Sequence, residues 1–398
     1  MGGHYRSPTW QGTLLLMTFP ASSAVPYPPV PHRSTLRLTE PGDLIAALPA
    51  MIGFYPEDSV VGVCLGGAYG TEMRGFIRGD IPYTDQNQQQ PSTYSHHRQA
   101  TRELGRSFAR FCVNNEVDEL VLIAIDSRND PRDREALLVA IGETTKARGI
   151  TITGAFHCTT IADGESWERI FPVHDSGTIS DPGSSEAAAL TVVAGRTIYD
   201  KRSDIEQSFE SRDSKRKRRI ADAMRQGSSA SSDSSRLISV LTAVGHIGAS
   251  QDHANGEPTQ SRELDDAEVI TVAQAIEHKS VRDCLFALSL TEHASAVDAV
   301  WTTLTQLVDG APRVEAATLA AFSAYIRGDG PRAGVALDIA LEIDPDHRMS
   351  TMLDQALRAG MPPHQVAGIA AIGWELAENL GVTLPPATEM HHAALEGP

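Results

Sequence analysis

The segment between residues 328 and 347, GDGPRAGVALDIALEIDPDH, constrains the fold more than any other part of the chain. Ala333, Leu337 and Ala340 follow one another at intervals of four and three residues, so they lie on one face of a helix. Pro345 comes soon after Ala340 and cannot continue the helix, because proline has no amide proton to donate. The pattern therefore predicts one half of a helical hairpin that packs on neighbouring helices.

Helical periodicity extends over almost the whole of residues 264–380, and the loops within it, such as 328–330 and 360–363, are short. The spacing from Ala333 to Pro345 matches the second helix and closing proline of a tetratricopeptide repeat. The preceding segment, Ala317–Phe322, supplies small and apolar residues but lacks the tryptophan, glycine and tyrosine of that repeat. Two interpretations stay open, a true repeat and an ordinary amphipathic hairpin.

Strand signals dominate the first half of the chain. Residues 59–65 and 73–81 are β-type runs on either side of a glycine pair, which predicts a hairpin. The segment Glu119–Asp126 (ELVLIAID) is apolar without interruption between its ends, as in a strand that is covered on both faces. Further elements are predicted around it: helices over 98–114 and 132–148, and strands over 150–158 and 166–171. The alternation predicts a mixed sheet with helices packed on it.

These patterns predict an α/β (α+β) domain with a mixed sheet followed by an all-α domain with tetratricopeptide-like hairpins. We expect the α/β domain over residues 35–225, a serine-rich linker over 226–235 and the helical domain over 236–382. Residues 1–34 are rich in proline and lack periodicity, so they predict a disordered leader. Residues 383–398 are predicted to be a flexible tail.

The charge balance argues against partners that carry phosphate. The chain has 51 acidic and 34 basic residues and a net charge of −17, so most of its surface repels nucleic acid and anionic membranes. The one basic cluster, Lys215–Arg219 (KRKRR), lies among acidic residues, which favours a solvated helix face over a phosphate site. No apolar run is long enough to span a bilayer. Nucleic-acid binding is therefore disfavoured, and no membrane association is predicted.

The spacing of the cysteines and the absence of known catalytic motifs limit the kinds of site that the sequence predicts. The four cysteines lie far apart without a CxxC or CxxH motif, which predicts no zinc site and fits free thiols in a reducing cytoplasm. The sequence also lacks a phosphate-binding loop, a dinucleotide fingerprint, a nucleophile elbow and an HExxH motif. We therefore predict neither a metal nor a cofactor.

Three carboxylates remain as weak candidates for catalytic residues. Glu57 and Asp58 lie in the turn before strand 59–65, and Asp126 ends strand 119–125. They could act as acid and base or bind a cation. The alternative is structural, because such residues also hydrogen-bond the backbone of turns and cap helices. Glu57 or Asp58 would come within reach of Asp126 only if the two strands run antiparallel.

Three blocks of sequence resemble one known family. They are residues 36–65 (LRLTEPGDLIAALPAMIGFYPEDSVVGVCL), 180–209 (SDPGSSEAAALTVVAGRTIYDKRSDIEQSF) and 328–363 (GDGPRAGVALDIALEIDPDHRMSTMLDQALRAGMPP). In order and spacing they are similar to the actinobacterial proteins with domain of unknown function 4192. The resemblance implies a cytoplasmic actinobacterial protein and supplies no activity. Family members carry a cysteine- and proline-rich stretch after a tryptophan, whereas residues 165–177 here contain no cysteine, so a metal role for those cysteines does not carry over.

The leading hypothesis from the sequence is a non-catalytic protein that binds a ligand or a partner, with the helical domain as the place where a protein or peptide would dock. The missing catalytic motifs and the repeat-like hairpins support it. The alternative is an enzyme of unknown chemistry with its site at Glu57, Asp58 and Asp126.

Overall fold

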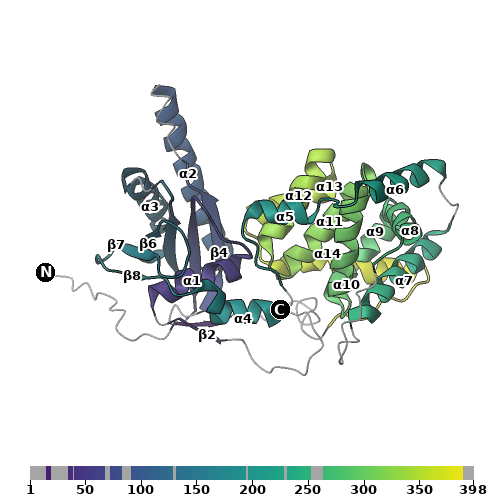
Figure 1. The fold of residues 1–398 in the computed structure, drawn as a ribbon, viewed down its shortest axis with the longest axis horizontal. Coiled ribbons are helices and arrows are strands. Elements are labelled where there is room, and N and C mark those ends of the chain that lie inside the picture. The colour runs from purple at the N-terminus through teal and green to yellow at the C-terminus, as the bar shows by residue number, and fades with distance from the viewer. Residues whose placement is uncertain are drawn as a thin grey trace. The chain divides into compact units, whose positions relative to one another are not determined.

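A computed structural model describes residues 15–18, 35–38, 40–67, 72–82, 91–128, 131–193, 196–227, 231–251 and 263–388. The chain forms two compact units, which meet in sequence between Lys201 and Arg202 (Figure 1). We expected the division at residues 226–235. Instead, the helices α5 (Arg202–Ser208) and α6 (Ser214–Gln226) belong to the second unit, where they pack on its other helices.

The first unit contains a six-stranded mixed sheet, as predicted. Its strands lie in the order β4-β3-β5-β6-β7-β8, and every neighbouring pair is antiparallel except β5 and β6. The predicted hairpin is the pair β3–β4. The strands are β3 (Ser59–Gly66), β4 (Glu72–Asp80), β5 (Glu119–Ile125), β6 (Thr151–Cys158), β7 (Ser166–Phe171) and β8 (Ser176–Thr178).

Strand β5 lies inside the sheet and is buried on both faces, which confirms the prediction from its apolar run. The two predicted helices, α2 (Pro91–Asn114) and α3 (Pro131–Lys146), pack against each other and therefore cover the same face. The opposite face is covered by α1 (Pro41–Ile52), whose Gly42 lies against Trp167 of β7. Helix α4 (Glu186–Val193) packs on α1 in turn, so nearly all sides of α1 are buried, which fits its apolar sequence.

Part of the predicted leader has structure. Residues Leu15–Thr18 form strand β1, which pairs antiparallel with β2 (Thr35–Leu38) in a separate two-stranded sheet. The expectation of disorder is therefore wrong for these four residues. The rest of the leader up to residue 34 lies outside the described residues.

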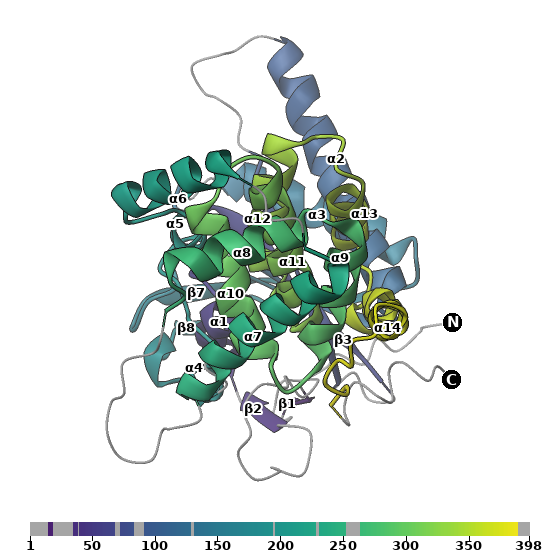
Figure 2. The ribbon, with the colours of Figure 1, turned by 90° about the vertical axis from the view of Figure 1, so that its right-hand side faces the viewer.

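The second unit is helical throughout its described residues, apart from the extended segment that follows its last helix. Figure 2 faces this unit and shows its neighbouring helices α10, α11 and α12. After α5 and α6 its helices are α7 (Asp233–Gln251), α8 (Asp266–Ile276), α9 (Lys279–Leu285), the 3-10 helix η2 (Phe286–Leu290), α10 (Ala294–Leu307), α11 (Ala311–Ile326), α12 (Gly330–Ile343), α13 (Arg348–Arg358) and α14 (Pro363–Asn379).

The hairpin that the sequence singled out is the pair α11–α12. Ala333, Leu337 and Ala340 are fully buried, and Ala340 packs against Val314 and Ala317 of α11. Pro345 follows the end of α12, as its chemistry requires. Helix α14 packs on α9, η2 and α11, so the helices close into a bundle around a common core. The close packing is confirmed, and the tetratricopeptide-like character stays a prediction.

Candidate functional site

Asp58 lies beside the loop that follows β5. Strands β3 and β5 are antiparallel, with Ser59 opposite Ile125, so the start of one strand lies next to the end of the other. The Asp58 carboxylate accepts hydrogen bonds from the amide and the hydroxyl of Ser127, at 3.1 and 2.6 Å from its Oδ1 atom. Its backbone φ of 43° is left-handed, which aspartate tolerates better than most residues. The antiparallel arrangement that the acidic hypothesis requires is thus present for Asp58.

Glu57 is engaged elsewhere. Its carboxylate lies 3.5 Å from Lys201 Nζ, and both side chains are more than half exposed. Exposed ion pairs of this kind contribute little to stability, because water screens both charges. Of the three carboxylates predicted as site residues, Glu57 is the one that the structure places in an ordinary surface pair.

Asp126 is buried to 1% exposure at the end of β5. Its Oδ1 atom accepts a hydrogen bond of 3.0 Å from the Arg128 amide, which is the local turn that the structural alternative predicted. Its Oδ2 atom lies 3.9 Å from Nη1 of Arg134, a buried residue in the first part of α3. The cation compensates for taking this carboxylate out of water.

Arg134 joins Asp126 to a network that the sequence analysis missed. Its Nη1 atom lies 3.0 Å from Nε2 of His157 on β6, and its Nη2 atom lies 2.9 Å from Oε1 of Glu168 on β7. The same carboxylate oxygen is 3.0 Å from Nδ1 of His157. His157 and Glu168 are cross-strand partners in the β6–β7 ladder, so pairing alone brings them together. In the sequence, only the positions of His157 and Glu168 on their strands and of Arg134 on its helix could have indicated this network.

The hydrogen bonds define the tautomer of His157. A guanidinium group has only donors, so Nε2 must accept from Arg134, and Nδ1 then carries the proton that it donates to Glu168. Burial lowers the pKa of His157 and the positive charge of Arg134 lowers it further, outweighing the opposite effects of Glu168 and Asp126. The imidazole is therefore neutral, and both of its nitrogens are engaged within the protein.

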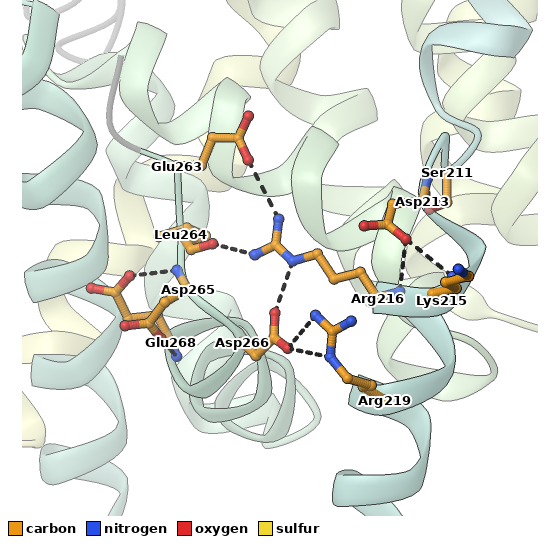
Figure 3. A network of polar contacts seen from close by, with 10 residues as sticks. All are labelled: Ser211, Asp213, Lys215, Arg216, Arg219, Glu263, Leu264, Asp265, Asp266 and Glu268. Atoms are coloured by element: carbon orange, nitrogen blue, oxygen red, sulfur yellow. Dashed lines mark hydrogen bonds and ion pairs between the residues drawn. The ribbon is translucent and has the colours of Figure 1, made fainter. Parts of the chain in front are cut away.

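The basic cluster on α6 is also engaged within the protein (Figure 3). Arg216 Nε donates to Asp266 Oδ1 at 2.8 Å, and Arg219 Nη2 lies 3.0 Å from the other oxygen of that carboxylate. Arg216 also donates to the Leu264 carbonyl, and Lys217 pairs with Asp309 at 2.8 Å. The hydrogen bonds from Arg216 hold the pKa of Asp266 below its ordinary value. These contacts tie α6 to the beginning of α8 and engage three of the five basic residues, Arg216, Lys217 and Arg219.

A second candidate site is an apolar hollow of about 350 Å³ in the helical unit. It is lined by Leu241, Val244, Gly245, Leu288, His293, Thr383, Leu384 and Pro385, which come from α7, η2, the start of α10 and the segment after α14.

The segment after α14, which forms one wall of the hollow, belongs to the part of the chain that was predicted to be a flexible tail, residues 383–398. Instead, Trp374 Nε1 donates to the Pro385 carbonyl and the Thr388 amide donates to the Leu290 carbonyl, both at 2.9 Å. Thr291 also forms a β-bridge with Ala387. Residues 383–388 are therefore held against the helices, whereas residues 389–398 lie outside the described residues.

The described part of the chain offers few other sites of recognisable chemistry. Within it, no three histidine, cysteine, aspartate or glutamate side chains gather in an arrangement that could hold a metal ion. Of the helices whose residues are described, none combines the length and apolar character needed to cross a bilayer.

Comparison with known proteins gives one match. The family described as Domain of unknown function (DUF4192) matches residues 41–364, and the chain therefore belongs to it. No curated protein and no solved structure matches.

Proposed function

We propose that this member of the DUF4192 family is a non-catalytic binding protein, and that its helical unit takes up a small, mainly apolar molecule in the hollow between α7, η2 and the segment after α14. The observation that carries the proposal is the hollow itself. Its volume of about 350 Å³ lies in the range of small-molecule sites, and its walls are aliphatic apart from His293 and Thr383.

His293 gives the hollow a polar end. Its side chain is 36% exposed, and its Nε2 atom lies 3.8 Å from the carboxylate of Glu292, a separation at which the ring keeps most of its hydrogen-bonding capacity. A ligand with an apolar body and a single polar group fits this combination, because the body displaces water from the aliphatic walls and the polar group meets the imidazole.

The hydrogen bonds of the polar residues near the strand ends support a non-catalytic role. Asp58 accepts two hydrogen bonds from Ser127, and Arg134 contacts both His157 and Glu168. A general acid or base must reach a substrate, and these groups reach one another instead. The alternative, an enzyme with its site at Glu57, Asp58 and Asp126, draws support from the proximity of Asp58 to the end of β5, whereas Glu57 pairs with Lys201.

A filling substitution tests the proposal. Gly245 lines the hollow, and a Cβ atom added there meets nothing within 4 Å, so we expect Gly245→Phe to extend into the hollow without a clash at its Cβ. Ile238→Phe is the matched control, because Ile238 lies on the same helix and is 53% exposed. Each protein is incubated with the low-molecular-mass fraction of a cell lysate, and retained compounds are identified by mass spectrometry. The wild type and the control should retain a compound that Gly245→Phe does not; equal retention by all three proteins contradicts the proposal.

The location of the protein and a second form of binding are proposed from the sequence. We place the protein in the cytoplasm of an actinobacterium, with free thiols at Cys64, Cys112, Cys158 and Cys284, as a reducing compartment favours. A protein or peptide that docks on the helical unit is the second form that binding could take. Capture of such a partner by the Gly245→Phe variant as well as by the wild type would separate it from a small molecule in the hollow.

A further inference from the structure

Two of the four cysteines meet in the core of the sheet unit. Gly62 of β3 lies against Phe108 of α2, because a side chain atom added at Gly62 would come within 2.9 Å of the phenyl ring. Cys64 follows two residues later on the same face of the strand, and Cys112 follows one turn later on the same face of the helix. A helical turn and two strand residues advance by nearly equal lengths, so Cys112 lies over Cys64. Both belong to one buried apolar cluster.

The two thiols lie close enough within this cluster for each to shift the pKa of the other. The hydrogen bond from Cys64 lowers the pKa of Cys112, whereas burial raises the pKa of Cys64. The two shifts favour ionisation of Cys112 over ionisation of Cys64. The other two cysteines differ, since burial raises the pKa of both Cys158 and Cys284.

A hollow borders Cys112, whose side chain is buried beneath it. It has a volume of about 430 Å³, and its wall contains Cys112 together with Arg74, Glu116, Asp118 and Arg148. These polar residues make the hollow a place for water and for small polar solutes rather than for apolar ones. Cys64 lies behind Cys112 and is not part of the wall.

We propose that Cys64 and Cys112 are an oxidisable dithiol that a small hydroperoxide converts into a disulfide between β3 and α2. The Cys112 thiolate attacks the peroxide oxygen, so that a sulfur–oxygen bond forms and the oxygen–oxygen bond breaks, with hydroxide as the leaving group. Cys64 sulfur then attacks Cys112 sulfur, the sulfur–oxygen bond breaks, and the departing hydroxide takes the Cys64 proton as water. Two thiols lose two electrons in total, and hydrogen peroxide is reduced to two molecules of water.

The geometry gives Cys112 and Cys64 different roles in the reaction. Cys112 receives the oxidant because it borders the hollow, and Cys64 resolves the product because it belongs to the same buried cluster and does not line this hollow. The bond requires the sulfurs to move from contact to a separation of about 2.0 Å. The disulfide would fix the last turns of α2 to the strand that it covers.

The full chain, reduced and freed of reductant, is exposed to hydrogen peroxide, alkylated under denaturing conditions and digested without reductant. Mass spectrometry should find a disulfide-linked peptide pair that contains Cys64 and Cys112, while Cys158 and Cys284 are recovered alkylated. The number of titratable thiols should fall by half. Full recovery of all four alkylated cysteines under peroxide that oxidises a free cysteine peptide overturns the proposal, as does a disulfide that joins Cys112 to any other residue.

Two variants assign the roles. In Cys64→Ala, Cys112 cannot be resolved, so a sulfenic acid should accumulate there and be trapped by dimedone in an amount several times that in the wild type. Cys158→Ala is the matched control, since Cys158 is equally buried but lies outside the pair, and it should form the same disulfide at the same rate. Equal dimedone labelling of Cys112 in the wild type and in Cys64→Ala would show that Cys64 does not resolve it.

Discussion

Arg282 and Glu315 form an ion pair inside the helical unit, and its removal gives the sharpest test of how that unit is stabilised. Their side chains are 7% and 12% exposed, and Nη1 of Arg282 lies 3.0 Å from each carboxylate oxygen. The remaining donors of Arg282 reach Asp283 at 2.9 and 2.6 Å, and His347 lies 3.5 Å from the Glu315 carboxylate. Every charge in this group is therefore compensated by a neighbour.

The size of the effect follows from the geometry. At 3.0 Å and an effective dielectric constant near 20, the attraction between the two charges is about 5.5 kcal/mol. Arg282→Met leaves the Glu315 carboxylate buried without its cation, and we expect it to lower the free energy of unfolding by about 3–5 kcal/mol. The double variant Arg282→Met with Glu315→Leu removes both charges and keeps the volume, so it should cost about 1 kcal/mol or less.

Urea unfolding measures these differences. Tryptophan fluorescence in a Trp10→Phe, Trp167→Phe background reports on Trp301 and Trp374, which belong to the helical unit. The single variants, the double variant and the parent then form a double-mutant cycle. A cost below about 1 kcal/mol for Arg282→Met, or a double variant as unstable as the sum of the two singles, would refute the reasoning that the pair compensates its own burial.

The same pair predicts a pH dependence. Burial raises the pKa of Glu315, but the hydrogen bond from His347 and the pairing with Arg282 outweigh burial and leave the pKa below its ordinary value. A carboxyl group of this kind contributes stability above the unfolded-state pKa of about 4.3, and the contribution is lost as the pH falls through the folded-state value. In Glu315→Gln, the loss of stability below about pH 4.3 should be smaller than in the parent.

Three further outcomes are expected. Leu337→Ala should cost about 2–5 kcal/mol by leaving a cavity and Ala340→Leu about 1–3 kcal/mol by overpacking, both measured by thermal melts; wild-type melting in both would show that these positions do not pack as described. Because burial and Arg134 lower the pKa of His157, the folded state resists its protonation, and the free energy of unfolding should fall as the pH drops below about 6.5. In His157→Gln, the free energy of unfolding should depend less on pH in this range. The same pH dependence in the variant and the parent would contradict the prediction. Asp58→Ala should cost about 1–3 kcal/mol in urea unfolding because Ser127 loses its acceptor, whereas Asp58→Asn keeps an acceptor and should cost less than half as much; equal costs would show that the hydrogen bonds do not matter.

The sheet was predictable where the signal is local. The apolar run of Glu119–Ile125 and the glycine pair after strand 59–65 act over a few residues, and both predictions hold. The distribution of helices over the two faces was not predictable, because it depends on how the chain returns to the sheet. Helices α2 and α3 are each amphipathic, and nothing in either segment indicates that both share one face while α1 covers the other.

The candidate site was predictable only in part. The turn before β3 and the end of β5 were recognised, and the antiparallel pairing that brings Asp58 next to Ser127 was weighed as a condition. The network of Arg134, His157 and Glu168 was missed because its members lie on three elements and meet through strand register. A single histidine in a strand gives no sign of its partners before the register is known.

In the helical unit, too, features encoded by a local pattern were predictable, and features that depend on distant segments were not. Spacing identified the face of α12 that packs on α11, since three residues on one helix suffice for the inference. The hollow escaped notice because its wall combines α7 with a segment after α14 that carries no periodic pattern. The position of the boundary at Lys201 was missed for a similar reason, because the serine-rich composition of residues 226–235 is stronger than any signal at residue 201.

The order of the strands divides the sheet into two local assemblies, β3–β4 and β6–β8, which β5 joins along two seams. The pair β3–β4 forms between neighbours in sequence, and so do β6, β7 and β8, whereas β3 and β5 meet only after the whole of α2 has been bridged. Closing such a loop costs entropy before the new contacts compensate, so we expect the β3–β5 seam to form after the local hairpins. Helix α2, 24 residues and therefore about 36 Å long, shortens the search because it returns the chain along the length of β3 and delivers β5 to its open edge. The helix that covers the seam is thus also the element that brings its two sides together.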